Sequence, residues 1–414
     1  MPFSVLIVGC GAQGKVISTF LSQSREVDKV LLADVDVETC NRHAYRVKST
    51  KLSTHSLDAS SVDSVAKLAE RADVIVNAVP PQFNLTLMDA ALKSETHYVD
   101  LAFGPPYDTF EKQMLKDVSF KRNNLTALTC TGSSPGIVNV VAANAADELD
   151  TVSSIRLRIG DMMRSKEPIS TWSPETMLGD MAEEPIVYKD GEYMKVPPFS
   201  GEEVFDFPEP IGPQPTFMHV HEEAITLPRF IGKGINYLDI KLGTPEMPMI
   251  KALVDLGLCS SDPIDVDGVK VIPRHLLLQL FPPTPTPEEI EKKLEAGIIT
   301  DAHQAYVVKI VGSRKSKTVT YRYTISAPSL RQVQKMMPGA THESFLTGTS
   351  AAIFTEMLGE GKIMTRGVIA PECLDRDARQ EYLARLANLN VKIGLMVERC
   401  LNRSLGRFSA QEFC

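Results

Sequence analysis

The sequence lacks the features that mark secreted, membrane-spanning or nucleic-acid-binding proteins. Its seven cysteines form no CxxC pair, which indicates free thiols in a reducing compartment. No apolar run approaches the roughly 18 residues that a membrane span needs. The amino terminus, MPFSVLIVGCG, has no basic segment ahead of its apolar residues, so we expect a first strand there and no signal peptide. These absences predict a cytoplasmic protein.

Acidic residues outnumber basic ones. The net charge is −8 and the isoelectric point is about 5.6, which argues against extended binding to nucleic acid or to an anionic membrane. One dense basic run, GSRKSK, lies between the β-rich runs YVVKIV and TVTYRYTI. This pattern predicts a hairpin whose basic side chains are solvated at its tip. The 414 residues are enough for two or more domains.

The first segment, FSVLIVGCGAQG, combines a short apolar strand with the spacing G-x-G-x-x-G. In such a motif Gly9 allows a tight turn, Gly11 lets the backbone approach a pyrophosphate, and Gly14 lets the helix pack close to the strand. Ala12 and Gln13 begin a helix whose free N–H groups and positive dipole end face the phosphates. The motif therefore predicts a dinucleotide-binding site.

A carboxylate follows at the spacing that such sites require. The second strand, KVLLAD, ends in Asp34, twenty residues after Gly14. In this position a carboxylate accepts hydrogen bonds from the adenosine ribose. Its charge would repel a 2′-phosphate, so we expect NAD, with NADP less favoured. The alternative is that Asp34 only caps a turn.

Strands and helices alternate through the first 140 residues. The strands ADVIVNAVPP, HYVDLA and LTALTCTG surround the helical run LTLMDAALKS. This order predicts an α/β Rossmann fold, a doubly wound parallel sheet with helices on both faces. Ligands bind beyond the carboxyl ends of such strands, where Asp58, Val79, Pro80 and Asp100 lie. We expect the first three to contact the cofactor and Asp100 to face the reacting groups.

The segment TGSSPGIVN, which follows the last of these strands, predicts a helix start. Ser134 is suited to the N-cap and Pro135 to the first helical position. Because helix starts attract anions, a substrate carboxylate could bind here, near Thr131 and Ser134. A capped helix with a purely structural role explains the same residues.

From about Thr151 the pattern changes to that of an α+β domain with a largely antiparallel sheet. SSIRLRIGD alternates like a strand, with Arg156 and Arg158 on its polar face. STWSPETMLGDM predicts a short helix beside the single tryptophan, Trp172, and PIVYKDGEYMKV predicts a hairpin. TPEEIEKKLEAG begins with the capping box of Thr286 and Glu289.

Two further helices are predicted, TGTSAAIFTEMLGEGKI and RQEYLARLANLNVKIGLMVERCL, whose apolar spacing indicates packing against the first lobe. The expected domains are residues 1–140 for the nucleotide, 141–340 for substrate and dimerisation, and 341–414 for the helical return.

The chain resembles the saccharopine dehydrogenase-like oxidoreductases, and within them the pattern is similar to that of the L-lysine 6-dehydrogenases. The resemblance covers most of the chain and is carried by VGCGAQG, LLADVD, HYVDLA, GSSPGIVN, TWSPETML, YKDGEYMKVP, VDGVKVIPRHLLLQL and GEGKIMTRGVIAPE. It implies a nucleotide-binding lobe, a substrate and dimerisation lobe, a carboxy-terminal return and at least a dimer. The stretch FMHVHEEAITLPRF differs from the lysine enzymes, which are rich in glycine and serine there. The resemblance therefore does not determine the identity of the substrate.

That stretch allows three interpretations. In a strand, His219 and His221 would point to one face, as two zinc ligands do, with Glu222 and Glu223 nearby. It could also be a polar strand edge. We favour a substrate clamp without a metal, in which Arg229 binds a carboxylate, a histidine accepts a proton and a glutamate holds an amino group. Because Arg229 follows a proline, we expect it in a loop.

These residues predict reversible hydride transfer between NAD and a carbon bearing nitrogen in an amino-acid substrate. Such a transfer needs a base to neutralise the nitrogen, and His221 and Asp100 are the candidates. We expect Arg229, Trp172, Thr131, Ser134 and His219 to contact the substrate. The alternative is an NAD(H)-binding sensor without turnover, which has no need of converging histidine, arginine and tryptophan side chains.

Overall fold

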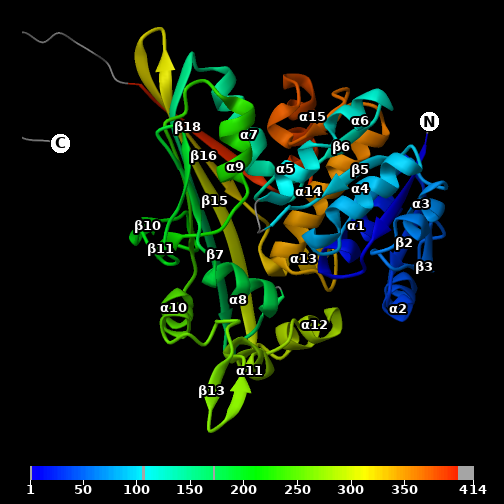
Figure 1. The fold of residues 1–414 in the computed structure, drawn as a ribbon, viewed down its shortest axis with the longest axis horizontal. Helices are drawn as coiled ribbons and strands as arrows, with labels where there is room; N and C mark the ends of the chain where they lie inside the picture. The colour runs from blue at the N-terminus through cyan, green and yellow to red at the C-terminus, as the bar shows by residue number, and fades with distance from the viewer. Residues whose placement is uncertain (1, 105–107, 171–172, 400–414) are drawn as a thin grey trace, which may run out of the picture.

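The computed structural model of the chain describes residues 2–104, 108–170 and 173–399. It consists of two lobes, each built around its own large sheet (Figure 1). No helix in this described part of the chain is long and apolar enough to cross a membrane. Trp172 lies outside the described residues.

The first lobe is a seven-stranded sheet in which every pair of neighbouring strands is parallel. In spatial order its strands are β17 (Gly367–Ile369), β6 (Thr126–Leu128), β5 (His97–Asp100), β4 (Val74–Asn77), β1 (Phe3–Val8), β2 (Val27–Asp34) and β3 (Leu52–Ser56). Its helices are α1 (Ala12–Gln23), α2 (Val37–Val47), α3 (Val62–Ala69), α4 (Asn84–Lys93), α5 (Asp108–Met114) and α6 (Asp117–Arg122), with the short η1 (Pro81–Phe83).

Both faces of this sheet are covered, as the sequence predicted. Val5 and Ile7 of β1 pack in one hydrophobic cluster with Ile17 of α1. Leu6 alternates with them and packs in a second cluster with Leu87 of α4. Successive side chains of a strand point to opposite faces, so a strand that is apolar throughout is the mark of a sheet buried between two helical layers. The doubly wound fold is confirmed.

The second lobe is a mixed nine-stranded sheet. Its main path runs β10 (Glu203–Asp206), β11 (Pro213–Met218), β12 (Tyr237–Gly243), β7 (Thr151–Ser165), β15 (Ile299–Arg314), β16 (Lys317–Ser326) and β18 (Lys392–Arg399). The hairpin of β8 (Ile186–Lys189) and β9 (Glu192–Lys195) extends from β12. Among the described strands of this sheet, only the pair of β12 and β7 is parallel.

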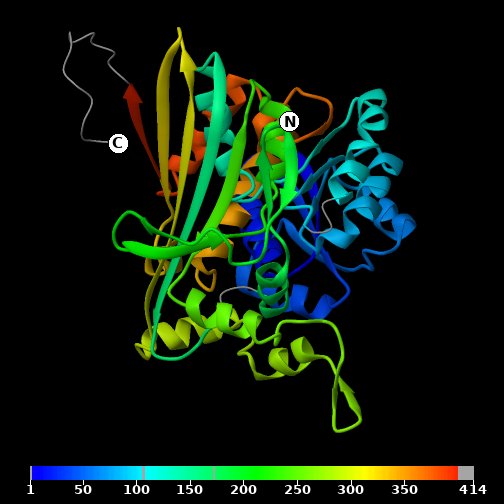
Figure 2. The same cartoon turned by 60° about the vertical axis from the view of Figure 1, so that its left-hand side comes forward.

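The other elements of this lobe lie mainly around the sheet and at one end of it. They are α7 (Ile137–Asp147), α8 (Pro174–Ala182), α9 (Glu223–Ile231), α10 (Met247–Asp255), α11 (Pro273–Leu280), α12 (Pro287–Glu295), α13 (Leu330–Met336) and the hairpin of β13 (Ile264–Val266) and β14 (Val269–Val271). Figure 2 shows this last hairpin projecting from the body of the protein. The capping box of α12 and the hairpin turn between β15 and β16 are confirmed.

Three local predictions need correction. Helix α7 begins at Ile137 with Gly136 as its N-cap, so Ser134 does not cap it. The run after α15 (Arg376–Ala387) is not a continued helix, because Asn390 adopts a left-handed φ of 59° and β18 then pairs with β16. Arg158, expected on a polar face, is buried, because Asp239 binds its guanidinium with two hydrogen bonds of 2.8 and 3.1 Å.

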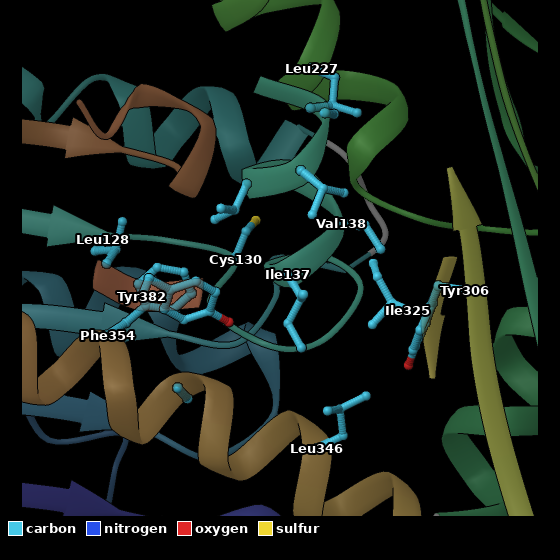
Figure 3. Packing of buried hydrophobic residues seen from close by; sticks show 14 of the residues in the cluster. Leu128, Cys130, Ile137, Val138, Leu227, Tyr306, Ile325, Leu346, Phe354 and Tyr382 are labelled. Carbon is cyan, nitrogen blue, oxygen red and sulfur yellow. The ribbon is translucent and has the colours of Figure 1, made fainter. Parts of the chain in front are cut away.

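The two lobes share one continuous core around α7. Helix α14 (His342–Gly359) packs on α1, and η2 (Pro371–Cys373) packs on α7 and α9. Figure 3 shows Ile137 and Val138 among Leu227, Ile325 and Leu346, which come from the second lobe and from α14. The carboxy-terminal segment therefore joins both lobes: β17 extends the first sheet and β18 the second.

Candidate functional site

The glycine-rich loop has the geometry that a dinucleotide needs. Gly9 has a φ of 109°, and a Cβ on Gly14 would lie 1.9 Å from the carbonyl oxygen of Gly9. Larger residues are therefore excluded at both positions, and α1 packs directly against the loop. At Gly11 a Cβ would meet nothing within 4 Å, so the backbone there is open to a ligand. Ala12 and Gln13 form the first turn of α1, as predicted.

Asp34 lies at the carboxyl end of β2 and binds this loop. Its Oδ2 accepts a hydrogen bond of 2.7 Å from the backbone N–H of Cys10, and its Oδ1 accepts one of 3.0 Å from Asp36. Each carboxylate oxygen has a second lone pair that can accept a further bond. Asp34 can therefore cap the turn and still accept a hydrogen bond from the adenosine ribose, although the sequence presented these two roles as alternatives.

The remaining predicted cofactor residues lie after β3 and β4. The Asp58 carboxylate is exposed and accepts hydrogen bonds from the backbone and hydroxyl of Ser60, which lower its pKa. Val79 donates its N–H to the Asn77 side chain, and Pro80 precedes η1. All three lie at the carboxyl edge of the parallel sheet, where ligands of this fold bind.

Asp100 and Thr131 form a buried link between β5 and the end of β6. Asp100 accepts hydrogen bonds from Gln113 at 2.7 Å, Tyr98 at 3.1 Å and the backbone of Cys130 at 2.9 Å. Burial raises the pKa of Asp100 to about 7. Thr131 donates to the Asp100 backbone oxygen at 2.7 Å. Both side chains are occupied with protein partners, and their contact with substrate stays a prediction.

The HVHEE segment is not a continuous strand. Strand β11 ends at Met218, and His219 makes one last backbone hydrogen bond, of 3.1 Å, to Ile240 of β12. The chain then leaves the sheet and enters α9, so the two histidines do not share a strand face. Their ring centroids are 5.4 Å apart and their planes differ by 58°. The polar strand edge, one of the three interpretations of this stretch, does not describe the residues after His219, which connect β11 to α9.

This connection brings the second lobe onto the carboxyl edge of the first. Glu222 Oε1 accepts a hydrogen bond of 2.9 Å from the backbone N–H of Gly104, which follows β5. Ser134, which follows β6, donates a hydrogen bond to Glu223 Oε1. Glu223 Oε2 lies 3.1 Å from His221 Nδ1, and its side chain is fully buried. The segment thus meets the first lobe at the ends of two central strands.

The acids of this cluster set the protonation of the histidine. Burial opposes a charge on His221, but the attraction of Glu223, Glu222 and Asp180 outweighs it and raises the pKa of the imidazole. Burial and the charge of Glu222 raise the pKa of the Asp180 carboxyl to about 7. Burial and the neighbouring His221 lower the pKa of His219 to about 3, so His219 is neutral. His221 is therefore the protonatable histidine of the pair.

The same residues have the spacing of a three-ligand metal site. Donor atoms of His221, Glu222 and Glu223 lie within 4.8 Å of one another. Both Glu223 oxygens already have partners in Ser134 and His221. Hydride transfer to a nicotinamide needs no metal, and we interpret the group as a proton-sharing cluster.

Arg229 is in a helix, not in the expected loop. Pro228 lies inside α9, and Arg229 belongs to its last turn. The guanidinium forms an ion pair with Glu111 and lies 5.6 Å from the ring centroid of Phe110. Its side chain is 35% exposed. Because Arg229 is seven residues after Glu222, the two lie on one side of the helix. Its binding of a substrate carboxylate stays a prediction.

Two groups of site residues were not predicted. Asp180 lies near the end of α8, and only its place in the quoted helix STWSPETMLGDM could have drawn attention to it. Asn139 of the PGIVN segment donates to Glu372 Oε2 and to Thr226 Oγ1, both at 3.1 Å. Burial raises the pKa of Glu372 to about 7. These two sequence segments, both part of the family resemblance, meet behind the His221 cluster.

A dinucleotide-binding lobe with a buried histidine–carboxylate cluster at its carboxyl edge defines an oxidoreductase of the two-lobed dehydrogenase class. Residues 5–128 match the saccharopine dehydrogenase NADP binding domain, and residues 132–391 match the saccharopine dehydrogenase C-terminal domain. The chain belongs to the saccharopine dehydrogenase family. The resemblance inferred from sequence motifs is confirmed at this level.

Known relatives extend this comparison. The chain is 25% identical over 400 residues to the carboxyaminopropylagmatine dehydrogenase of Synechocystis sp., covering 94% of this chain and 96% of the relative. It is 27% identical over 304 residues to the carboxynorspermidine synthase of Vibrio cholerae, covering 67% and 72%. The saccharopine dehydrogenase (L-Glu forming) of Saccharomyces cerevisiae has the same fold, with a TM-score of 0.70, 16% identity, and coverage of 95% and 100%.

Proposed function

We propose that this protein is a nicotinamide-dependent oxidoreductase that interconverts an imine and a secondary amine. Its substrate carries a carboxylate and at least one further cationic nitrogen, as a carboxylated diamine or polyamine does. The observation that carries the proposal is the group of three carboxyl side chains around His221: Glu222 and Glu223, which are buried, and Asp180, which is partly buried.

This group favours a cationic substrate on electrostatic grounds. Burial raises the pKa of both Asp180 and Glu222, so the charge of His221 stabilises their ionised forms only in part. An ammonium or guanidinium placed beside them would supply the missing charge and form charge-assisted hydrogen bonds. The relatives from Synechocystis and Vibrio support this choice, because their names describe carboxylated polyamines.

The chain's own residues supply the proton that accompanies hydride transfer. A bound nicotinamide nucleotide provides or accepts the hydride at the carbon of the C–N bond. In the reductive direction His221 protonates the nitrogen as the imine becomes an amine. In the oxidative direction it takes that proton, because hydride leaves only when the nitrogen lone pair is free to form the iminium.

The surroundings of His221 suit this role. Glu223 engages Nδ1, and Nε2 has no hydrogen-bond partner among the described residues, so Nε2 is the atom that faces the reaction. Ser134 holds the Glu223 carboxylate from the first lobe and thereby fixes the ring. Orientation of a catalytic imidazole by a buried carboxylate is a recurring arrangement in acid–base catalysis.

The cofactor proposal rests on the glycine loop and Asp34. The open backbone at Gly11 and the close contact of Gly9 with Gly14 fit a pyrophosphate. We propose NAD over NADP, because the Asp34 carboxylate would repel a 2′-phosphate. The name of the matching family domain mentions NADP, so the choice between the two cofactors needs a direct measurement.

The decisive experiment follows nicotinamide absorbance in both directions with NADH and NADPH. Reductive reactions pair a carboxylate-bearing aldehyde with a diamine, with agmatine or with a monoamine of the same length. We expect turnover with the amines that carry a second cationic group and much slower turnover with the monoamine. Equal rates with the monoamine and with the amines that carry a second cationic group would contradict the need for that group. Absence of turnover with every amine, lysine and saccharopine included, would contradict an enzyme of this class. Cofactor binding that no amine perturbs would then favour a sensor.

A further inference from the structure

A cavity of about 420 Å³ lies away from the His221 cluster, on the outer side of α1. Its walls come from α1 and α2 of the first lobe and from the segments that precede α12 and α14. These elements can be followed in Figure 1, where α12 and α13 lie beside the first lobe. Cavities that bind small molecules have volumes of roughly 300–1,000 Å³, so this one is large enough for a ligand.

Charge in this cavity has one sign. The lining side chains include Lys15 and Arg46, and no carboxylate lines the cavity among the residues that the structure describes. Arg46 forms ion pairs with Glu288 and Glu291, which do not line the cavity. Lys15 is half-buried and forms no ion pair with a carboxylate of the described residues, although Glu288 is close enough to interact with its charge. In a protein with a net charge of −8, a cavity lined by two basic side chains and by no carboxylate of the described residues is unusual.

Of the neighbouring groups, His43 is neutral and only the helix starts add to the positive potential. His43, buried in the same wall, has a pKa lowered to about 4 by burial and by the charges of Lys15 and Arg46. The first turns of α1, α12 and α14 border the cavity at Ala12, Thr286 and Thr341. Helix starts carry partial positive charge. The helix starts therefore favour an anion over a cation.

The rest of the wall is apolar or bears hydroxyl groups. Methionine, proline, valine and isoleucine side chains share the lining with threonine and serine hydroxyls. Methionine adapts its shape to different apolar ligands. A ligand of this cavity therefore needs an apolar body in addition to its negative group.

We propose that this cavity binds a small amphipathic organic anion, a carboxylate or a phosphate, with the charged group at Lys15 and the apolar part against the proline and methionine wall. The ligand would contact both lobes at once. The site is separate from the proposed active site and does not depend on the reaction assigned to it.

The test uses the full-length protein saturated with the nicotinamide nucleotide that it binds more tightly, so that the cofactor site is occupied. Octanoate, octyl phosphate and octylamine are titrated by calorimetry below micelle-forming concentrations. We expect the anions to bind and octylamine not to bind, and the tighter of the two anions identifies the carboxylate or the phosphate as the source. Binding of neither anion, or equal binding of octylamine, would overturn the proposal.

Two variants locate the binding. Lys15→Met should weaken the anion by about tenfold to a hundredfold, the value of a hydrogen-bonded charge, whereas Lys29→Met, an exposed lysine on β2, should leave it unchanged. Thr19→Trp should fill the cavity from the outer side of α1 and abolish binding. Anion binding that survives both Lys15→Met and Thr19→Trp would place it elsewhere. Circular dichroism checks that each variant is folded. If Thr19→Trp is not folded, the comparison of Lys15→Met with Lys29→Met locates the binding by itself.

Discussion

At the scale of single residues, the chemistry of the proposed site depends on how His221 is held. Its imidazole is surrounded by Asp180, Glu222 and Glu223, and these acids come from two different elements. Ser134 and Gly104 of the first lobe fix two of them. A change at any of these positions should therefore alter proton transfer before it alters folding.

The first prediction concerns the pH dependence of His221. Its pKa lies above the usual 6.5, and imine reduction needs the protonated form. The reductive rate should be constant at low pH and fall as the pH rises through that pKa, while the oxidative rate should rise. His221→Asn should abolish this inflection and lower the rate by roughly a hundredfold or more. His275→Asn, at an exposed position, is the control, and an unchanged profile in His221→Asn would assign the proton to another group.

The second prediction concerns Asp34 and cofactor choice. Two unit charges about 4 Å apart interact by roughly 1–4 kcal/mol at effective dielectrics of 80 to 20. Asp34→Ser should therefore weaken NADH and improve NADPH, changing their ratio by about tenfold or more. Asp34→Asn keeps an acceptor for the loop and separates loss of charge from loss of the Cys10 contact. Fluorescence titration measures both affinities, and equal wild-type affinities would show that Asp34 does not discriminate.

The third prediction tests whether Arg229 binds substrate or only Glu111. If Arg229 meets the substrate carboxylate, Arg229→Ala should raise the Michaelis constant by about tenfold to a hundredfold, with cofactor affinity within about twofold. Arg229→Lys should restore only part, because lysine lacks the planar fork. Glu111→Gln breaks the same ion pair and should leave the Michaelis constant nearly unchanged. Equal effects of Arg229→Ala and Glu111→Gln would leave the arginine a structural role.

At the scale of elements, the start of α7 decides where Ser134 lies. The chain turns at Gly136, whose φ is 140°, and its Cβ would lie 1.8 Å from the Gly132 carbonyl oxygen. This tight turn releases Ser134 from capping and directs it to Glu223. The helix start is therefore set by backbone space as much as by capping residues.

The fourth prediction follows from that turn. Gly136→Ala should lower the free energy of unfolding by more than about 2 kcal/mol, because it combines left-handed strain with a backbone clash. Gly257→Ala is the matched control, since Gly257 also has a positive φ, of 75°, but has open space around its Cβ. It should cost only about 1 kcal/mol. Urea unfolding compares the two, and equal costs would show that the turn relaxes without penalty.

At the scale of the whole molecule, burial changes the ionisation of acidic groups in several parts of the fold. Asp100, Asp180 and Glu372 each have a pKa raised to about 7 by burial. In the unfolded chain such groups ionise near pH 4. The folded protein therefore binds more protons between these values, and its stability falls as the pH rises from about 4 through 7.

The fifth prediction is the opposite of ordinary acid denaturation. The free energy of unfolding should be larger near pH 6 than near pH 8 by about 1 kcal/mol for each of these groups, and the melting temperature should be correspondingly higher near pH 6. Glu372→Gln removes one buried ionisation and should reduce the difference. Differential scanning fluorimetry measures both proteins. A melting temperature that rises steadily with pH would mean that these acids are ionised in the native state.

Local sequence patterns alone determined much of this protein. The glycine loop, the strand ending in Asp34, the buried parallel strands and the capping box at Thr286 depend on neighbouring residues and backbone geometry. Their physical causes lie within a few residues of one another, so the sequence displays them. The family resemblance has the same basis, since its motifs are short and continuous.

Only the tertiary structure decided the site. His221, Asp180 and Ser134 are distant in the chain and meet because the second lobe reaches the ends of β5 and β6. The strand expected at His219 ends one residue earlier, where its pairing with β12 stops. The helix expected after Ala387 is replaced by β18, which pairs with β16. A local sequence pattern cannot show either pairing. Burial sets the raised pKa of the carboxyl groups, and burial is a property of the folded chain as a whole.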